Sequence, residues 1–211
     1  MEQPKSMLEF ALTKIREDIQ SGKYPPGSKL SSKDISEELG ISRTPINAAI
    51  NRLVAEGLAE AIPRRGNIVT ELSANKINDI VDVRIMMETH AAKTAVKNFE
   101  KHMDTILEME SVLEQLDNIG DEEYTTASKL EARFHTLFVS LSENEQLTNL
   151  FENNWNVSTV YHAHLLSEKP LSQFYVKYNK SHREILKLLK EKNVEALCKA
   201  IEEHIDVCYE V

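Results

Sequence analysis

The chain has 211 residues, of which 41% are hydrophobic, and this is enough for one large domain or two small ones with real cores. No apolar run approaches the roughly 20 residues that a membrane-spanning helix needs. The first residues, Met1 to Lys5, lack the apolar core of a signal peptide. These features argue against membrane and secreted proteins and predict a soluble, cytoplasmic protein with no membrane partner.

The net charge of −9 is divided unevenly along the chain. Residues 1–72 carry ten Lys+Arg and ten Asp+Glu, whereas residues 73–211 carry 15 and 24. Within residues 41–67, four Arg outnumber two Glu. This excess of basic residues is small for a nucleic-acid-binding surface, so such a surface here would need two copies of the chain and would be sensitive to salt.

Periodicity and turn residues divide the first 40 residues into two helices. Apolar residues recur at helical spacing over residues 6–21, and the helix ends at Ser21-Gly22 before a Pro-Pro-Gly turn. A second, short helix is capped by Ser32 and closed by Gly40.

The segment from Ile41 to Gly66 is the most informative part of the chain. Ser42 lies at an N-cap position, where its hydroxyl would accept a bond from a free helix N–H, and Pro45 lies in the first turn. The helix that begins near residue 43 has one apolar face, while Arg43, Asn47 and Asn51 form a polar one. A short helix, a tight turn and a longer helix are typical of a helix-turn-helix.

Two short strands are expected after this helix, over residues 58–62 and 66–70. They flank a hairpin tip that holds Arg64 and Arg65, which suits a phosphate backbone or a minor groove. A cap for a new helix follows near residue 73. We therefore place a domain boundary between residues 72 and 73.

Residues 74–211 contain one Pro and one Gly, and their apolar residues follow the helical period almost throughout. The expected helices cover residues 74–98, 102–118, 121–142, 145–167, 172–191 and 193–209. The predicted fold is thus mainly α: a winged helix-turn-helix in residues 1–72 and an all-α antiparallel six-helix bundle in residues 73–211.

Four side chains of the helical part have the spacing of metal ligands. Glu131 and His135 lie four residues apart, on one face of a helix. His182 and His204 lie in the last two expected helices, among apolar positions that point inward. Three His and one carboxylate would suit Zn²⁺, Ni²⁺ or a similar divalent ion. A His on an apolar face is more often a hydrogen-bonded core residue, and the pattern alone leaves this alternative open.

Four short motifs stand out in the first part of the chain: Gly22 to Leu30 (Gly-Lys-Tyr-Pro-Pro-Gly-Ser-Lys-Leu), Ser42 to Ile46 (Ser-Arg-Thr-Pro-Ile), Glu56 to Leu58 (Glu-Gly-Leu) and Arg65-Gly66. Together they resemble the winged helix-turn-helix of GntR-family bacterial transcription regulators. The helical half resembles the FCD ligand-sensing domain of the FadR subfamily in its six-helix, VanR-like form. The resemblance implies a homodimer that binds a palindromic double-stranded DNA operator and responds to a small-molecule effector, often a carboxylate.

The winged helix-turn-helix supplies a set of residues expected to contact DNA. These are Ser42, Arg43, Thr44, Asn47, Asn51, Arg64, Arg65 and Gly66. Family members usually have Arg-Glu where this chain has Asn47-Ala48, and that Arg commonly contacts DNA. Asn cannot clamp guanine as Arg does, but it can pair with adenine through two hydrogen bonds, so the operator preference is expected to differ. The alternative for Asn51 is that it lies on a solvated helix face and does not contact DNA.

FCD domains typically carry an Asp-x-x-Phe-His run with two further His in the last two helices. At these positions this chain has Glu131, His135, His182 and His204. The longer Glu side chain still reaches a metal but changes the ligand geometry, which indicates a lower affinity or a different ion. Zn²⁺ is the expected cofactor, with Ni²⁺ as another candidate.

The resemblance also indicates residues for the effector. Arg84 lies in a run, Asp-Val-Arg-Ile-Met-Met-Glu, that resembles the first FCD helix, in which an Arg reaches the cavity. The alternative is an intrahelical pair of Arg84 with Glu88, four residues on. His162, in the fourth helix of the domain, is a second candidate for the pocket.

The pattern as a whole predicts a metabolite-responsive transcription regulator, most simply a repressor, and no enzyme. A metal-dependent enzyme is one alternative, because a site of three His and a carboxylate can activate water. It is weaker, since no further carboxylate–His spacing supplies a general base and an enzyme has no use for the Arg43 face or the Arg64-Arg65 wing. Another alternative is a regulator whose metal is structural or absent.

Overall fold

The protein is described here by a computed structural model, which covers residues 6–71, 73–120, 124–166 and 171–209. Of residues 124–125, 160–166, 171–178 and 207–209 only the backbone is described. The chain divides into two compact units, residues 1–74 with 156–165 and residues 75–155 with 166–211. The predicted division between residues 72 and 73 lies close to the first of these limits.

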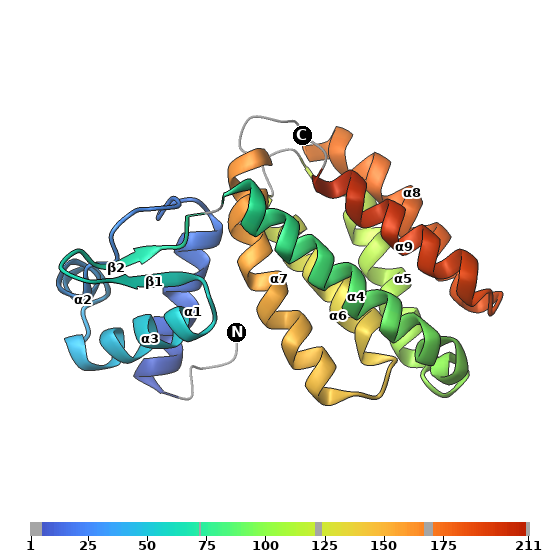
Figure 1. Ribbon diagram of the computed structural model, residues 1–211, viewed down its shortest axis with the longest axis horizontal. Helices are drawn as coiled ribbons and strands as arrows, with labels where there is room; N and C mark the ends of the chain where they lie inside the picture. The colour runs from blue at the N-terminus through green and yellow to red at the C-terminus, as the bar shows by residue number, and fades with distance from the viewer. Residues whose placement is uncertain (1–5, 72, 121–123, 167–170, 210–211) are drawn as a thin grey trace. The chain divides into compact units, whose positions relative to one another are not determined.

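Residues 6–71, the described stretch of the N-terminal part, form three helices and a two-stranded antiparallel hairpin (Figure 1). The elements are α1 (Met7–Gln20), α2 (Ser32–Leu39), α3 (Arg43–Ala55), β1 (Ala59–Ile62) and β2 (Gly66–Val69). Both α1 and α2 pack against α3, and α3 leads directly into β1. Ile46, Ala49, Ile50 and Leu53 of α3 are fully buried, because they form the apolar face that the other helices cover. The winged helix-turn-helix is thus confirmed.

Two expected helix caps differ in the structure. Ser31, not Ser32, caps α2, and its Oγ accepts a hydrogen bond from the N–H of Asp34 at 3.3 Å. Ser42 occupies the N-cap position of α3 as predicted, but its side chain makes no capping hydrogen bond. The reason lies in the sequence, because an N-cap side chain commonly takes the N–H three residues on, and that residue is Pro45, which has none.

The wing has one strand-like segment more than the sequence predicts. Residues 27–30 run antiparallel to β2, with a bridge between Lys29 and Ile68. The N–H of Leu30 donates to the carbonyl of Asn67 at 2.9 Å, and the N–H of Gly27 donates to that of Val69 at 2.9 Å. The backbone of β2 is therefore paired on both sides, which fixes the hairpin to the rest of the domain.

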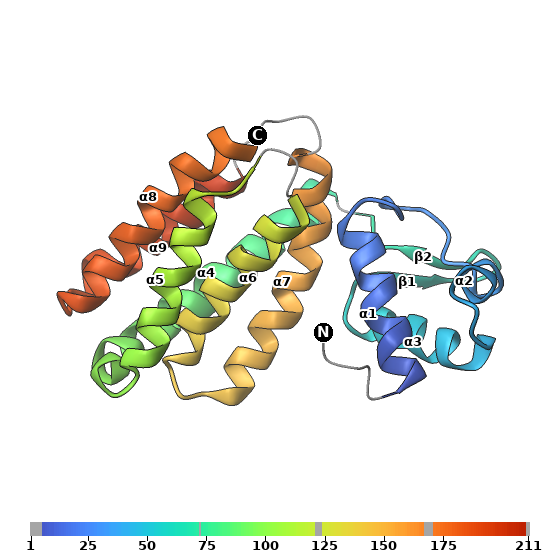
Figure 2. The same ribbon diagram turned by 180° about the vertical axis from the view of Figure 1, so that it is seen from behind.

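The six helices expected in the second part are all present. They are α4 (Ala74–Asn98), α5 (Met103–Asp117), α6 (Tyr124–Ser140), α7 (Glu145–Leu166), α8 (Leu171–Lys190) and α9 (Val194–Tyr209), and a short 3-10 helix (Phe99–Lys101) follows α4. In Figure 1, α4 and α9 lie toward the viewer with α5, α6 and α8 behind them, and Figure 2 shows these helices from the other side. None of the helices described is long and apolar enough to cross a bilayer.

The core of the bundle is apolar, with aromatic rings from two helices. Phe134 and Phe138 of α6 and Phe151 of α7 are at most 1% exposed, and Leu189 of α8 and Ile201 of α9 are fully buried. A group of buried polar side chains interrupts this core where α4, α6, α8 and α9 meet. That group is the candidate site for a metal and a ligand.

One buried carboxylate of the N-terminal part gives a test of its stability. Asp18 of α1 is 5% exposed and accepts hydrogen bonds from Lys14 and Lys23, each at 2.8 Å. Burial alone would raise the pKa of Asp18, but the hydrogen bonds and charges of the two lysines outweigh it and lower the pKa. A lowered folded-state pKa means that the stabilisation is complete above the unfolded-state pKa and is lost as the pH falls through the folded-state value.

We expect Asp18→Asn to lower the free energy of unfolding at pH 7 by about 1–3 kcal/mol, because two charge-assisted hydrogen bonds are lost. The difference from the unsubstituted protein should shrink below about pH 4, where the carboxyl becomes protonated in the unfolded chain. Urea denaturation at pH 7 and pH 3.5 measures both values. Glu37→Gln is the control, since Glu37 is exposed and only 3.9 Å from Lys33. Equal stability of Asp18→Asn at pH 7 would contradict the expectation.

Candidate functional site

The polar face of α3 is fully exposed. Arg43, Asn47 and Asn51 all point away from the apolar core, and Ser42 and Thr44 at the start of the helix are exposed as well. The Nη2 atom of Arg43 lies 3.5 Å from the Oγ of Ser32 in α2. This arrangement leaves amide and guanidinium groups free to meet base edges, as the recognition helix of a helix-turn-helix does.

The wing tip presents two arginines on a tight turn. The N–H of Arg65 donates to the carbonyl of Ile62 at 3.1 Å, with Pro63 and Arg64 at the corner. Arg64 has a φ of 66°, in the left-handed region, and Gly66 has a φ of 87°. A side chain in this region costs about 1–2 kcal/mol. Arg64, Arg65 and Gly66 are all exposed, so the turn holds two positive charges in solvent at the end of the hairpin.

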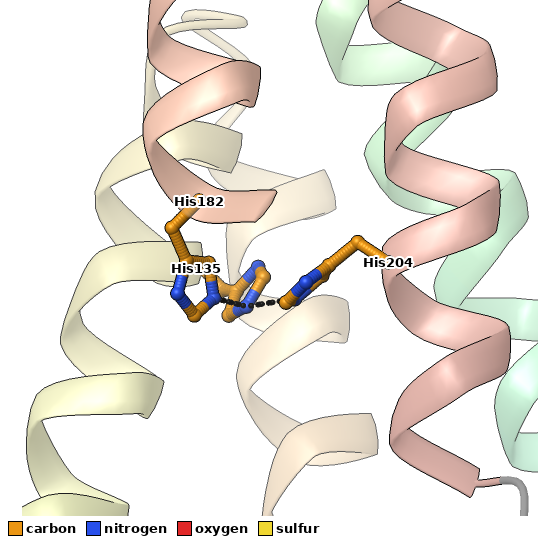
Figure 3. Close-up of side chains that lie close together, drawn as sticks. All are labelled: His135, His182 and His204. Carbon is orange, nitrogen blue, oxygen red and sulfur yellow. Dashed lines mark hydrogen bonds between the residues drawn. The ribbon is translucent and has the colours of Figure 1, made fainter. Parts of the chain in front are cut away.

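Three of the predicted metal ligands meet inside the bundle. His135 comes from α6, His182 from α8 and His204 from α9, and each is at most 2% exposed. The Nε2 atom of His135 lies 3.2 Å from that of His182 and 3.3 Å from that of His204. Figure 3 shows the three rings pointing toward one another. Residues up to 69 positions apart in the chain thus present one nitrogen each to a common point.

The outer ring nitrogens of two of these residues are held by hydrogen bonds. The Nδ1 of His135 lies 2.9 Å from Oε2 of Glu88, and the Nδ1 of His204 lies 2.7 Å from Oγ of Ser181. Burial alone would raise the pKa of Glu88, but its electrostatic interactions and hydrogen bonds with His135 and Arg84 lower it to about 2. Glu88 is therefore an ionised acceptor, which places the His135 proton on Nδ1 and its Nε2 lone pair toward the cluster.

The distances within the cluster fit a divalent metal. Zinc–nitrogen bonds of 2.0–2.1 Å in a tetrahedral site put the ligand nitrogens about 3.4 Å apart, and two of the three separations, 3.2 and 3.3 Å, come close to that value. Burial lowers the pKa of both His135 and His182, which favours the neutral imidazole that binds metals. These residues are suited to hold Zn²⁺ or a similar ion.

Glu131 adds an oxygen beside the three nitrogens. Its Oε2 lies 3.4 Å from the Nε2 of His182 and 3.9 Å from that of His135. Its Oε1 is buried without a hydrogen-bond partner, as is the Nδ1 of His182, within the described part of the chain. Burial raises the pKa of Glu131 to about 8. A buried carboxyl without a donor is costly, and a bound cation would remove this cost.

Arg84 contacts the cluster directly. It is 1% exposed, its Nε donates to Oε1 of Glu88 at 2.7 Å, and its Nη2 lies 2.9 Å from the Nε2 of His135. Its guanidinium carbon lies 4.5 Å from the ring centre of Trp155, within cation–π range. The two alternatives for Arg84 are therefore compatible, because it both pairs with Glu88 and reaches the site. The side chain of His162 lies outside those described.

Two family models match the chain. The FCD domain model covers residues 79–207, and the model of bacterial regulatory proteins of the gntR family covers residues 9–69. The chain belongs to the GntR family and carries an FCD domain. As a GntR-family protein with an FCD domain it is a transcription regulator and not an enzyme.

Individual relatives agree with this assignment. The GntR-family chain is 29% identical over 184 residues to YdhC, an uncharacterized HTH-type transcriptional regulator of Bacillus subtilis, covering 86% of this chain and 80% of YdhC. It is 29% identical over 143 residues to the gluconate operon transcriptional repressor of Bacillus subtilis, covering 66% and 56%. The solved structure of E. coli McbR/YncC superposes with a TM-score of 0.82 at 22% identity, over 96% of this chain and 94% of that one, which shows a shared fold.

Three residues of this site were not predicted from the sequence as site residues. Trp155 of α7 packs beside His135, with ring centres 5.0 Å apart, and Oγ of Ser181 lies within hydrogen-bond distance of Nδ1 of His204. Glu88 was expected only as an alternative partner of Arg84. Its position four residues after Arg84 places it on the same helix face, so a search for a carboxylate facing the predicted ligands would have found it. Trp155 and Ser181 gave no comparable signal.

A substitution at the wing tip can distinguish a contact with DNA from a contribution to the stability of the protein. We expect Arg64→Gly to fold with unchanged or slightly raised stability, because Gly adopts a φ of 66° without the side-chain penalty. It should also weaken DNA binding and reduce the salt slope by about one charge, if Arg64 contacts a phosphate. Thermal unfolding and fluorescence anisotropy at several salt concentrations measure these effects. Lys33→Gly, which removes an exposed charge elsewhere, is the control, and an unchanged salt slope for Arg64→Gly would count against the contact.

The chain contains one Trp, and it lies beside the candidate ligands, so it reports on metal binding. We expect Ni²⁺ or Cu²⁺ to quench the fluorescence of Trp155 and to saturate at one ion per chain. His182→Ala should weaken this binding roughly 10–100-fold or more. His102→Ala is the matched control, because His102 is an exposed residue paired with Glu143 at 2.8 Å. Equal titration curves for the two variants would contradict a metal site at His182.

Proposed function

We propose that this GntR-family regulator is a homodimer that represses transcription from a palindromic operator and responds to a carboxylate metabolite bound beside a metal ion. The observation that supports this best is the convergence of three buried imidazoles beside Arg84, in a chain whose residues 7–69 form a winged helix-turn-helix. The proposal treats residues 1–72 as the DNA-binding domain and residues 73–211 as the sensor.

In the DNA-binding domain, α3 enters the major groove and the wing follows the backbone. Arg43 reads a base or an adjacent phosphate, and Asn47 and Asn51 set the sequence preference, with adenine the natural partner of an Asn side chain. Ser42 and Thr44 contact phosphates at the start of the helix. The support for these roles is that all five side chains are exposed together at one end and one face of α3.

In the sensor domain, His135, His182 and His204 hold the ion and Glu131 is the fourth ligand. A bound divalent ion supplies positive charge and open positions for a ligand oxygen. Arg84 gives a planar guanidinium that donates two parallel hydrogen bonds to a carboxylate, and its 1% exposure keeps that contact out of water. His162 remains a candidate contact for the rest of the effector. Zn²⁺ is the ion we favour, with Ni²⁺ next.

A homodimer is supported by apolar side chains on the surface of the sensor. Val83 and Met86 of α4 are 39% and 63% exposed, and Leu150 of α7 is 60% exposed. The two helices are neighbours, since Nδ2 of Asn154 donates to the carbonyl of Ile80 at 3.4 Å. Exposed apolar side chains on adjacent helices are typical of a protein interface. A two-fold dimer then requires a palindromic operator.

Repression and a carboxylate effector are supported by a relative. The gluconate operon transcriptional repressor is named for repression and for an operon of a carboxylate. For the response, the effector must bind two arrangements of the dimer unequally. The two arrangements would differ in the spacing of the recognition helices relative to one major-groove repeat of about 34 Å.

The test begins with genomic DNA fragments recovered on the full-length protein, from which one operator is chosen. Fluorescence anisotropy then measures operator binding by chelator-treated protein, by the same protein with Zn²⁺ or Ni²⁺, and by each form with a panel of carboxylates. We expect carboxylates to change operator affinity only in the metal-loaded form, because the oxygen ligand and Arg84 act together.

Arg43→Ala is the control variant, which should lose operator discrimination and keep metal binding. A response to carboxylates that survives complete metal removal would make the metal structural or irrelevant. Recovery of no sequence-specific fragment would contradict the DNA-binding proposal, whatever the result with metal.

A further inference from the structure

Each ring nitrogen of His135 contacts one residue of α4. Glu88 accepts the Nδ1 proton at 2.9 Å, and Nη2 of Arg84 lies 2.9 Å from Nε2. That Nε2 is also the atom that faces His182 and His204 at 3.2 and 3.3 Å. The guanidinium of Arg84 and the proposed metal would therefore compete for the one lone pair of this Nε2 atom.

Glu88 divides its two oxygens between these partners. Oε1 accepts from the Nε of Arg84 at 2.7 Å, and Oε2 accepts from His135. All three side chains are 1% exposed, so water does not compete for the hydrogen bonds. The orientation of the imidazole ring is therefore set by a fixed acceptor on one side and a fixed cation on the other.

We propose that Glu88 and Arg84 are positioning residues that set the metal affinity of His135 in opposite directions. Glu88 presents the Nε2 lone pair of His135 to the metal, and Arg84 competes with the metal for the same lone pair. This inference rests on the metal site of the proposed function and goes beyond it, because it assigns roles to two residues that are not themselves ligands.

The role of Glu88 follows from the hydrogen-bonding rules of an amide. Arg84 is always charged and needs an acceptor, so a Gln at position 88 would turn its oxygen toward Arg84. Its NH₂ group would then face Nδ1 of His135 as a donor. Nδ1 would have to accept this hydrogen bond and so would carry no proton. The imidazole proton would move to Nε2, where it blocks metal binding. Loss of such an outer partner typically weakens metal binding 10–100-fold.

The role of Arg84 follows from its contact with Nε2. One lone pair cannot accept from a guanidinium and bind an ion at the same time, so metal binding requires Nη2 to leave His135. The positive charge of Arg84 also repels a divalent cation over a few ångströms. The N–H group released in this way becomes available to a carboxylate, so the ion and the carboxylate would favour each other's binding.

Zinc affinity of the full-length protein tests this, measured by competition with a chromogenic chelator. We expect Glu88→Gln to weaken Zn²⁺ binding by roughly 10–100-fold. We expect Arg84→Met, which removes the donor and the charge at similar length, to tighten it by about tenfold or more. Glu143→Gln is the matched control, because Glu143 also pairs with a His, at 2.8 Å, but on the surface. A merely structural role would weaken binding in both variants.

A second measurement does not depend on the folding of a variant. In the metal-free, ¹⁵N-histidine-labelled protein without substitutions, long-range ¹H–¹⁵N spectra identify which ring nitrogen of His135 carries the proton. A proton on Nδ1 supports the inference, and a proton on Nε2 overturns it.

The two proposals fail in different ways. If the unsubstituted protein binds no Zn²⁺, the metal site itself is wrong and both proposals fall. If it binds Zn²⁺ but Glu88→Gln binds equally well, or Arg84→Met binds more weakly, only the inference on these residues is overturned.

Discussion

The helical domain depends on the neutralisation of one buried cation. Arg84 cannot lose its proton, so its place inside the bundle requires the ionised Glu88 beside it, and Glu88 in turn holds the ring of His135. Removing either partner would leave an uncompensated charge in an apolar core, at a cost of several kcal/mol. This constraint explains why the polar side chains of the cluster lie together, with phenylalanine rings and aliphatic side chains packed around them.

The same network joins helices that are distant in the chain. Arg84 and Glu88 come from α4, His135 from α6, and His182 and His204 from α8 and α9, so the position of the cluster depends on the packing of all four. Trp155 of α7 covers the guanidinium on one face. A ligand bound at this cluster would therefore contact most of the elements of the domain, which is the geometry that the proposed sensing role needs to convert local binding into a change of helix arrangement.

Much of the fold could be predicted from the sequence, because periodicity and turn residues are local signals. The six helices of the FCD domain, the helix-turn-helix and the hairpin all follow from them, and the cluster of His135, His182 and His204 followed from inward-facing positions. The predicted side-chain cap of α3 was wrong, because Pro45, three residues after Ser42, has no N–H to donate. The pairing of residues 27–30 with β2 was not predicted, because it joins segments that are distant in the sequence. Glu88 was underestimated for a similar reason, since its partner His135 lies 47 residues away.

The uncapped start of α3 has a consequence for how the protein meets its target. A serine cap normally satisfies one of the free N–H groups of the first turn, and here the hydroxyl of Ser42 makes no such bond. The positive end of the helix dipole is thus left open at the edge of the polar face, where an anion is the natural complement. A backbone phosphate in this place would complete the first turn, so that DNA itself would act as the missing cap of the helix that reads it.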